Sequence, residues 1–289
     1  MRKLVNKNKI NLLEFLTTAG YSKTKAKQLL KYRAFSVGDV TLSRHDHTLL
    51  PGDEVIVKTE KEMGKETKSC PGLTIIYEDE AIIVIDKSAG LLTIATEKEK
   101  TRTAYYRLTA WLKERSGSSG ERIFIVHRLD RETSGLLVFA KNEPAKRTMQ
   151  DNWKQVDKKY TAIVEGVPKE KSGRIASNLR EAKSLRVYSV HNSKGEGKPS
   201  VTNYELLKTA DDYAVLEITL ETGRKNQIRV HLSDIGHPVV GDKKYGARTD
   251  PFKRLALHAN YLAFMHPVSG KRMEFESTMP AKFKMLFRE

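Results

Sequence analysis

The sequence is poor in the features that would tie the protein to disulfide bonds, metal ions or membranes. Cys70 is the one cysteine among 289 residues, so neither an internal disulfide nor a cysteine-based zinc site can form. The His residues lack the spacing of metal ligands, and we expect no metal site. No apolar run approaches the length of a membrane span, and no signal-peptide pattern opens the chain. We expect a soluble protein of the cytoplasm that does not engage membranes.

Acidic residues are in the minority. Lys and Arg number 52 against 36 Asp and Glu, which gives a net charge of +16. Such an excess favours an anionic partner, with nucleic acid as the leading class and a membrane surface as the second. The same charge would also serve solubility alone. The length allows either two domains or one sizeable domain with a small appendage.

A polar segment between two apolar runs is the most informative stretch. Ile123–Val126 and Leu136–Ala140 are short and bounded by turn-forming residues, which predicts two buried strands. Between them, Asp130 lies close to Arg128 and Arg131, whose positive charge favours an ionised carboxylate. An ionised Asp on a loop can act as a nucleophile or a general base. Composition alone favours the simpler interpretation, an Asp paired with its neighbours in a turn.

Residues 127–137, His-Arg-Leu-Asp-Arg-Glu-Thr-Ser-Gly-Leu-Leu, resemble the signature of the RluA-type pseudouridine synthases, which isomerise uridine within RNA. The resemblance implies that Asp130 is catalytic and that Arg128 and Arg131 contact RNA. It implies an α+β fold with a large, mainly antiparallel sheet and a central cleft, as the strand-rich pattern also indicates. No electrons or groups enter or leave this isomerisation, so we expect no cofactor.

Two further segments continue the resemblance. Tyr160, in the predicted strand 158–166, matches an active-site Tyr that would stack on the uracil and help to remove the proton from C5. Residues 222–231 are similar to a third motif, in which Arg229 matches the arginine that pairs with the catalytic aspartate. Asn226 stands where the commoner motif has His, and residues 241–246 continue the likeness in a structural role.

The N-terminal residues 1–58 predict a small separate α/β domain. Lys23, Lys27 and Lys31 share one face of a predicted helix over residues 23–33. The order of elements resembles the S4-type RNA-binding module, and this implies that the three lysines contact RNA phosphate; a solvated helix face is the alternative. Residues 59–72 read as a linker, and residues 73–289 as the catalytic domain.

Periodicity predicts the remaining elements. A hairpin is expected over 73–85, helices over 103–115, 144–153 and 227–235, and a half-buried strand over 213–221. Residues 168–200 read as a loop-rich segment that either faces RNA or is simply solvated.

Three functions remain open. The first is a monomeric RNA pseudouridine synthase, an isomerase of the intramolecular-transferase kind, acting on 23S ribosomal RNA or alternatively on tRNA. The second is a non-catalytic RNA-binding or ribosome-assembly factor, which would not require Asp130, Tyr160 and Arg229 together. The third is a hydrolase that uses Asp130 and Glu132 as paired carboxylates, although neighbours in one loop rarely flank a scissile bond.

Overall fold

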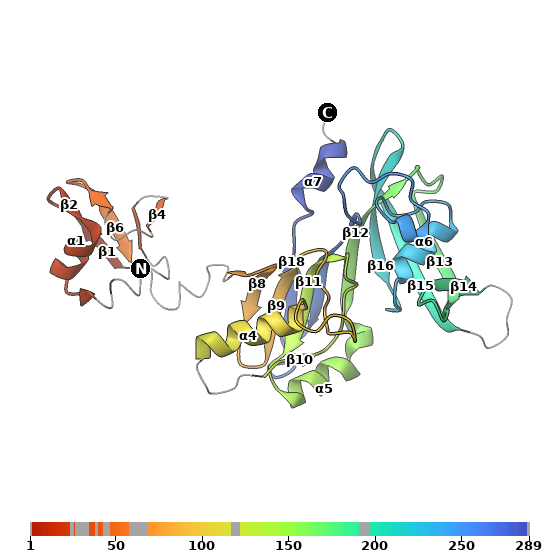
Figure 1. The fold of residues 1–289 in the computed structure, drawn as a ribbon, viewed down its shortest axis with the longest axis horizontal. Coiled ribbons are helices and arrows are strands. Elements are labelled where there is room, and N and C mark those ends of the chain that lie inside the picture. Colours follow the sequence, from red (N-terminus) through yellow and green to blue (C-terminus); the bar gives the residue numbers. More distant parts are fainter. Residues whose placement is uncertain are drawn as a thin grey trace. The chain divides into compact units, whose positions relative to one another are not determined.

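A computed structural model of the chain describes residues 2–23, 26, 35–37, 40–42, 47–57, 69–116, 122–190 and 197–287. The chain divides into two compact units, Met1–Lys68 and Ser69–Glu289 (Figure 1). Most of the predicted linker, up to residue 68, lies outside the described residues. The second unit begins at Ser69 rather than at residue 73, because Ser69–Cys70 forms strand β7 of its large sheet.

The first unit contains one described helix of more than one turn, α1 (Leu12–Thr18). Its strands are β1 (Arg2–Val5), β2 (Ile10–Asn11), β3 (Phe35–Val37), β4 (Val40–Leu42), β5 (Thr48–Leu49) and β6 (Glu54–Val57). Four of them form an antiparallel sheet in the order β1-β6-β3-β4, and β2 pairs with β5. Lys23 is exposed, whereas Lys27 and Lys31 lie outside the described residues.

The second unit is built on one large sheet. Its strands are β7, β8 (Leu73–Glu78), β9 (Ile82–Lys87), β10 (Phe124–Ile125), β11 (Ser134–Ala140), β12 (Asp157–Glu165), β13 (Ser172–Glu181), β14 (Val187–Val190), β15 (Lys198–Ala210), β16 (Tyr213–Leu220), β17 (Leu257–Met265) and β18 (Arg272–Glu276). The order is β14-β13-β15-β16-β12-β17-β11-β9-β8-β7, with β10 on β11 and β18 on β17. Only the β11–β17 pair is parallel among the described pairings, which confirms the mainly antiparallel α+β prediction.

Helices cover both faces of this sheet (Figure 1). They are α4 (Ala104–Ser116), α5 (Glu143–Asp151), α6 (Gln227–Asp234) and α7 (Ala281–Lys284), with 3-10 turns η2 (Trp153–Gln155), η3 (Lys243–Tyr245) and η4 (Met285–Phe287). Within the described part of the chain, no helix has the length and apolarity needed to cross a membrane.

Strand β11 shows how the two faces are filled. Leu137 and Phe139 pack with α4, and Leu136 and Val138 pack with α5, because successive strand side chains point to opposite faces. All seven residues of β11 are buried, so the apolar run of the sequence becomes a central strand covered on both sides. The polar segment that precedes it is thereby fixed at the end of the most buried strand.

The predicted hairpin, the three helices of this unit and the strand at 213–221 are all confirmed as β8–β9, α4, α5, α6 and β16. The loop prediction for residues 168–200 is wrong. This segment contains β13, β14 and the start of β15, paired as antiparallel neighbours. These strands lie at the margin of the sheet and expose much of their length, so their sequence carries little hydrophobic alternation.

Candidate active site

The segment that carries Asp130 is a tight turn held against the central sheet. The backbone N–H of Thr133 donates to the carbonyl of Asp130 at 3.2 Å, which closes the turn just before β11. Gly135 follows with φ +115°, and an added Cβ there would lie 2.2 Å from the carbonyl oxygen of Ala259. Only glycine allows this close approach of β11 to β17. The motif glycine therefore fixes where the loop leaves the sheet.

Residues of the 86–93 segment hold the loop from the other side. The Thr93 hydroxyl donates to the Leu129 carbonyl at 2.8 Å and accepts from the Leu129 N–H at 3.1 Å. The buried Lys87 ammonium donates to the carbonyl oxygens of Leu91 at 2.8 Å and Arg131 at 3.2 Å. Burial lowers the pKa of Lys87 to about 8, although the carboxylates of Glu132 and Asp130 oppose the shift. The hydrogen bonds of both side chains fix the position of the Asp130 loop.

Asp130 opens into a cavity of about 160 Å³ between this loop and the start of α6. The same cavity is lined by Tyr160 from β12 and Arg229 from α6, so the three residues singled out by the sequence meet at one place. Asp130 is the only carboxylate among the described lining residues. The complete described lining is Arg128, Leu129, Asp130, Thr133, Tyr160, Leu220, Gly223, Arg224, Lys225, Asn226, Gln227, Ile228, Arg229 and Leu257.

Tyr160 reaches the cavity from a strand that changes register beside it. Pairing between β12 and β17 shifts between Lys159 and Tyr160, and such a bulge re-aims the side chain that follows. Burial raises the pKa of the Tyr160 phenol, and the charge of Asp130 raises it further. The phenol therefore stays protonated, with an apolar ring face available for stacking.

The environment of Asp130 balances burial against positive charge. Burial raises the pKa of its carboxyl group, while the charges of Arg229 and Arg128 and a hydrogen bond from the Asn226 backbone N–H lower it. Burial prevails, so the pKa lies above its usual value. The positive charge of Arg128 favours the ionised carboxylate, as the sequence indicated, but the larger effect of burial was not visible there. A carboxyl with a raised pKa is a stronger base than an ordinary Asp.

Arg229 does not hold Asp130 in the way the sequence predicted. Its guanidinium forms a two-point ion pair with Asp242, with Nε to Oδ2 at 2.6 Å and Nη2 to Oδ1 at 2.7 Å. Among the described contacts, no hydrogen bond joins Arg229 to Asp130, and the two interact through their charges. The planar fork needs a carboxylate in its own plane, and Asp242, which is buried, supplies it. Arg229 therefore acts on Asp130 through its charge rather than through a hydrogen bond.

Asn226 makes the direct contact that Arg229 does not. It has φ +54° and ψ +17°, a left-handed conformation that Asn tolerates better than most residues. Its side-chain amide donates to the Tyr245 hydroxyl at 3.1 Å and accepts from Nη1 of Arg229 at 3.1 Å. These two bonds fix the conformation in which its backbone N–H meets Asp130.

The sequence did not assign Asn226, Asp242 or Tyr245 to the catalytic site. Asp242 and Tyr245 belong to residues 241–246, whose likeness to the family indicated only a structural role. Their proximity to Arg229 depends on η3 packing near α6, which no local pattern encodes. The departure from His at Asn226 was the one signal in the sequence that pointed to this contact.

The remaining residues of the 127–131 segment divide into buried and exposed members. His127 accepts a hydrogen bond from the Val138 N–H at 3.1 Å and stacks on Trp153 with ring centroids 4.4 Å apart. Burial lowers the pKa of His127 to about 3, so it is a neutral structural residue. Arg128 and Arg131 are exposed, and Arg128 also lines the cavity. Both are free to meet an anionic strand at the cavity mouth.

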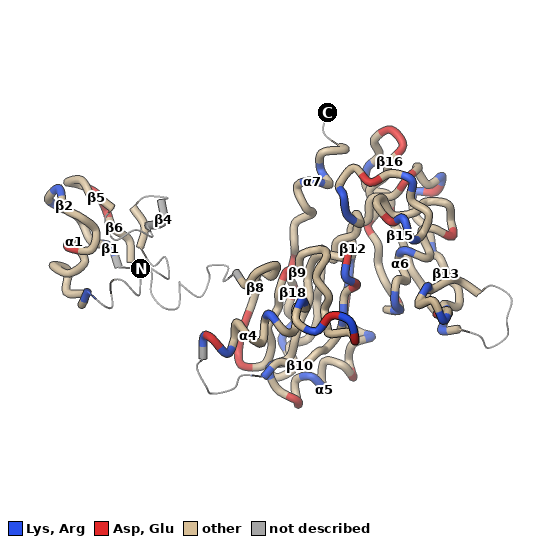
Figure 2. The backbone as a smooth tube through the Cα atoms, in the orientation of Figure 1, with Lys and Arg blue, Asp and Glu red and all other residues tan. Residues whose placement is uncertain are grey.

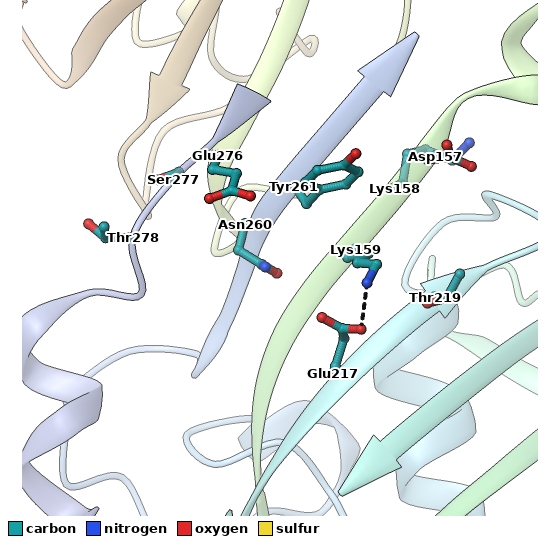
Figure 3. A pocket seen from close by; sticks show the side chains of 10 residues that line it. All are labelled: Asp157, Lys158, Lys159, Glu217, Thr219, Asn260, Tyr261, Glu276, Ser277 and Thr278. Atoms are coloured by element: carbon teal, nitrogen blue, oxygen red, sulfur yellow. Dashed lines mark hydrogen bonds and ion pairs between the residues drawn. The ribbon is translucent and has the colours of Figure 1, made fainter. Parts of the chain in front are cut away.

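A larger hollow of about 470 Å³ lies on the other face of the sheet. Lys159 lines it, whereas the next residue, Tyr160, lines the Asp130 cavity, as expected for neighbours on a strand. Figure 3 shows Lys159 and Glu217 pointing toward one another, and their ion pair measures 2.8 Å. No group of His, Cys, Asp and Glu that could hold a metal ion occurs in the described part of the chain. Asp157, which also lines this hollow, pairs with Arg272 at 2.8 Å.

The comparison with family models decides between the functions that the sequence left open. The model of the RNA pseudouridylate synthases matches residues 81–234, which include Asp130, Tyr160 and Arg229. The chain belongs to this family. It is 36% identical over 270 residues to an RNA pseudouridine synthase of Bacillus subtilis, YlyB, covering 91% of this chain and 88% of the relative. It is 34% identical to ribosomal large subunit pseudouridine synthase D of Haemophilus influenzae, covering 91% and 85%.

Solved structures of pseudouridine synthases share the fold. Human RNA pseudouridylate synthase domain containing 4 is 26% identical with a TM-score of 0.61, over 72% of this chain and 89% of the human chain. Human RNA pseudouridylate synthase domain containing 1 is 28% identical with a TM-score of 0.57, over 74% and 86%. The prediction of an RluA-type pseudouridine synthase is confirmed, and the protein is an isomerase that converts uridine in RNA to pseudouridine. The non-catalytic and hydrolase alternatives are set aside.

Proposed function

We propose that this pseudouridine synthase uses Asp130 as its catalytic carboxylate. The observation that carries the proposal is that Asp130 is the only acid among the described residues lining the cavity that it shares with Tyr160 and Arg229. A uridine inside a folded RNA cannot reach this cavity, so it must leave its stack and enter as a flipped base. The exposed Arg128 and Arg131 then meet the flanking phosphates.

Inside the cavity, the roles follow from the two raised pKa values. The Tyr160 phenol stays protonated, so its ring stacks on the uracil and its hydroxyl assists the removal of the C5 proton without being the base. The C–N glycosidic bond breaks, the base turns, and C5 attaches to the sugar. The proton on C5 must then leave, and the Asp130 carboxylate, with its raised pKa, is the base placed to take it. Arg229 favours the ionised form of Asp130 through its charge.

A purified-enzyme assay tests this assignment. RNA transcribed with uridine tritiated at C5 releases tritium to water each time a pseudouridine forms. Asp130→Asn keeps the shape of the side chain and removes the charge, so tritium release should stop while RNA binding remains. Glu132→Gln, two residues away and outside the described lining, is the matched control and should keep its activity. Tritium release by Asp130→Asn at the wild-type rate would contradict the assignment.

We further propose that the substrate is 23S ribosomal RNA. Support comes from the relatives named ribosomal large subunit pseudouridine synthase D, which cover most of this chain at 34–36% identity. A transfer RNA is the competing substrate. Parallel tritium-release reactions on 23S ribosomal RNA and bulk tRNA transcripts distinguish them, and release from tRNA alone would overturn the proposal. We also propose that the enzyme acts in the cytoplasm as a monomer.

The first unit is proposed to be an S4-like RNA-binding module over residues 1–58. Its small sheet with α1 and the exposed Lys23 support this, together with the order of elements in the sequence. Lys27 and Lys31 are proposed to share the contact with RNA. Removing residues 1–68, up to the boundary between the two compact units, should weaken binding to long RNA and leave tritium release at saturating RNA intact. Unchanged affinity would contradict the proposal.

A further inference from the structure

Three cations lie against one buried tyrosine beside the Asp130 cavity, and a fourth acts on one of them. Tyr245 lies in a small apolar cluster between η3, α6 and β14. The guanidinium carbons of Arg229 and Arg186 lie 4.9 Å and 5.6 Å from the centre of its ring, and the Lys244 ammonium lies 5.8 Å away. Lys225 adds a fourth positive charge that is felt at Lys244. Figure 2 shows Lys and Arg positions gathered around α6 and β13.

Acidic partners account for only half of these charges. Arg229 is paired with Asp242, and Lys225 is paired with Glu181. Among the described residues, Arg186 and Lys244 have no carboxylate within ion-pair distance, and the Lys244 ammonium donates only to the Leu185 carbonyl at 3.3 Å. Both side chains belong to exposed residues. Two positive charges therefore remain for an external anion.

The neighbouring positive charges disfavour the protonated form of Lys244. Burial lowers its pKa, and the positive charges of Arg229, Lys225 and Arg186 lower it further, against the opposing charge of Asp242. Like charges held together repel, and an anion placed among them removes that repulsion. Arg186 is held near the ring partly because β14 begins at the next residue, Val187, whose N–H donates to the Tyr245 hydroxyl at 3.2 Å.

The position of this cluster relates it to the substrate. Arg229 and Lys225 line the Asp130 cavity and also act on Lys244, so the unpaired cations lie beside the cavity rather than on a remote surface. A cavity of about 160 Å³ is suited to one nucleoside, and the phosphates of the strand must remain outside it. We propose that Arg186 and Lys244 form a binding site for a backbone phosphate of the RNA strand whose uridine enters the Asp130 cavity. The inference rests on the proposed catalytic role of Asp130.

Salt dependence tests the site separately from catalysis. Binding of the full chain to single-stranded oligouridylate is measured by fluorescence anisotropy over a range of KCl concentrations. Each phosphate contact on a single strand contributes about 0.7 to the slope of log K against log salt. Arg186 and Lys244 share one phosphate, so the double variant Arg186→Gln with Lys244→Gln should reduce the slope by about 0.7. An unchanged slope would overturn the proposal.

A matched variant removes the same charge from the same segments. Lys183→Gln with Lys243→Gln alters two exposed lysines near Arg186 and Lys244 in sequence, and Lys243 faces Asp250 at 3.9 Å instead. This control should keep the wild-type slope. An equal decrease of the slope in both double variants would show that general positive charge, and not a specific site, binds the RNA. The charge-preserving pair Arg186→Lys with Lys244→Arg should restore the slope, which separates lost contacts from lost folding.

Tritium release completes the test. The double Gln variant should raise the KM for 23S ribosomal RNA several-fold and leave kcat within about twofold, because a phosphate contact outside the cavity positions the strand. A fall in kcat with unchanged KM would contradict a phosphate site. Absence of tritium release from every RNA with the wild-type enzyme would defeat the proposed function, whereas the slope measurement would still report on the cluster.

Discussion

Two hollows lie on opposite faces of the same sheet, and the smaller one is the proposed active site. In the larger, about 470 Å³, Lys159 and Glu217 form a partly exposed ion pair. The smaller, about 160 Å³, is lined by Asp130 and Arg229. Among the described residues, Asp130 has no two-point ion pair there, because Arg229 forms its two-point pair with Asp242. Volume therefore does not identify the site. The proposal rests instead on a cavity-lining carboxylate with a raised pKa.

One substitution in each hollow tests the difference between the two most strongly. Asp130→Asn in the smaller hollow should reduce tritium release at least ~10³-fold, the scale of a lost acid–base group. Asp157→Asn in the larger hollow loosens an exposed pair with Arg272 and should leave the rate within about twofold. Equal losses in the two variants would remove the distinction between the hollows.

The ion pairs beside the two hollows should differ in their contribution to stability. The side chains of Arg229 and Asp242 are 12% and 1% exposed, so Asp242→Asn leaves a buried guanidinium unpaired and should cost about 3 kcal/mol of unfolding free energy. The Lys159–Glu217 pair is 42% and 25% exposed, and Glu217→Gln should cost under about 1 kcal/mol. Urea unfolding of both variants measures the difference, and similar costs would show that the inner pair is not buried in solution.

Substitutions of Asn226 test whether its hydrogen bonds and its left-handed backbone hold Asp130 in position. Asn226→Gly keeps the left-handed backbone but loses the bonds to Tyr245 and Arg229, so kcat should fall about tenfold, equivalent to about 1.4 kcal/mol. Asn226→Ala should be worse, because φ +54° costs a Cβ-bearing residue about 1 kcal/mol more. Steady-state tritium release measures both. If Ala were the better of the two, the left-handed conformation would not matter to catalysis.

The acid limb of the pH profile reports the charge balance at Asp130. Its pKa is raised by burial and held down by Arg229, so the ionised, active form appears only as the pH rises through a value above the usual Asp range. Arg229→Gln removes the opposing charge and should move the midpoint of the limb up by about one pH unit. Arg272→Gln, beside the larger hollow, should leave the midpoint in place. A downward shift with Arg229→Gln would contradict the assigned sign.

The residues that sequence could place are those whose neighbours are local or whose motif is long. The eleven-residue segment around Asp130 indicated the catalytic loop, and the apolar run after it indicated the buried strand β11. Tyr160 and Arg229 were reached through resemblance, and both do line the cavity. In each case a contiguous pattern carried the information.

What sequence missed depends on contacts between distant segments. The carboxylate that Arg229 binds is Asp242, 13 residues away and on another element. The arginines near Asp130 were visible in the sequence, but the burial that outweighs them was not. The marginal strands β13 and β14 were taken for loops because pairing with a neighbour, rather than an apolar face, defines them.

The most direct test of the account is a transcriptome-wide pseudouridine map from three strains. One carries the native protein, one lacks it, and one carries Asp130→Asn. At least one pseudouridine in 23S ribosomal RNA should be present in the first strain and absent from the other two. A site that is lost without the protein and retained with Asp130→Asn would contradict the proposal that Asp130 performs the isomerisation.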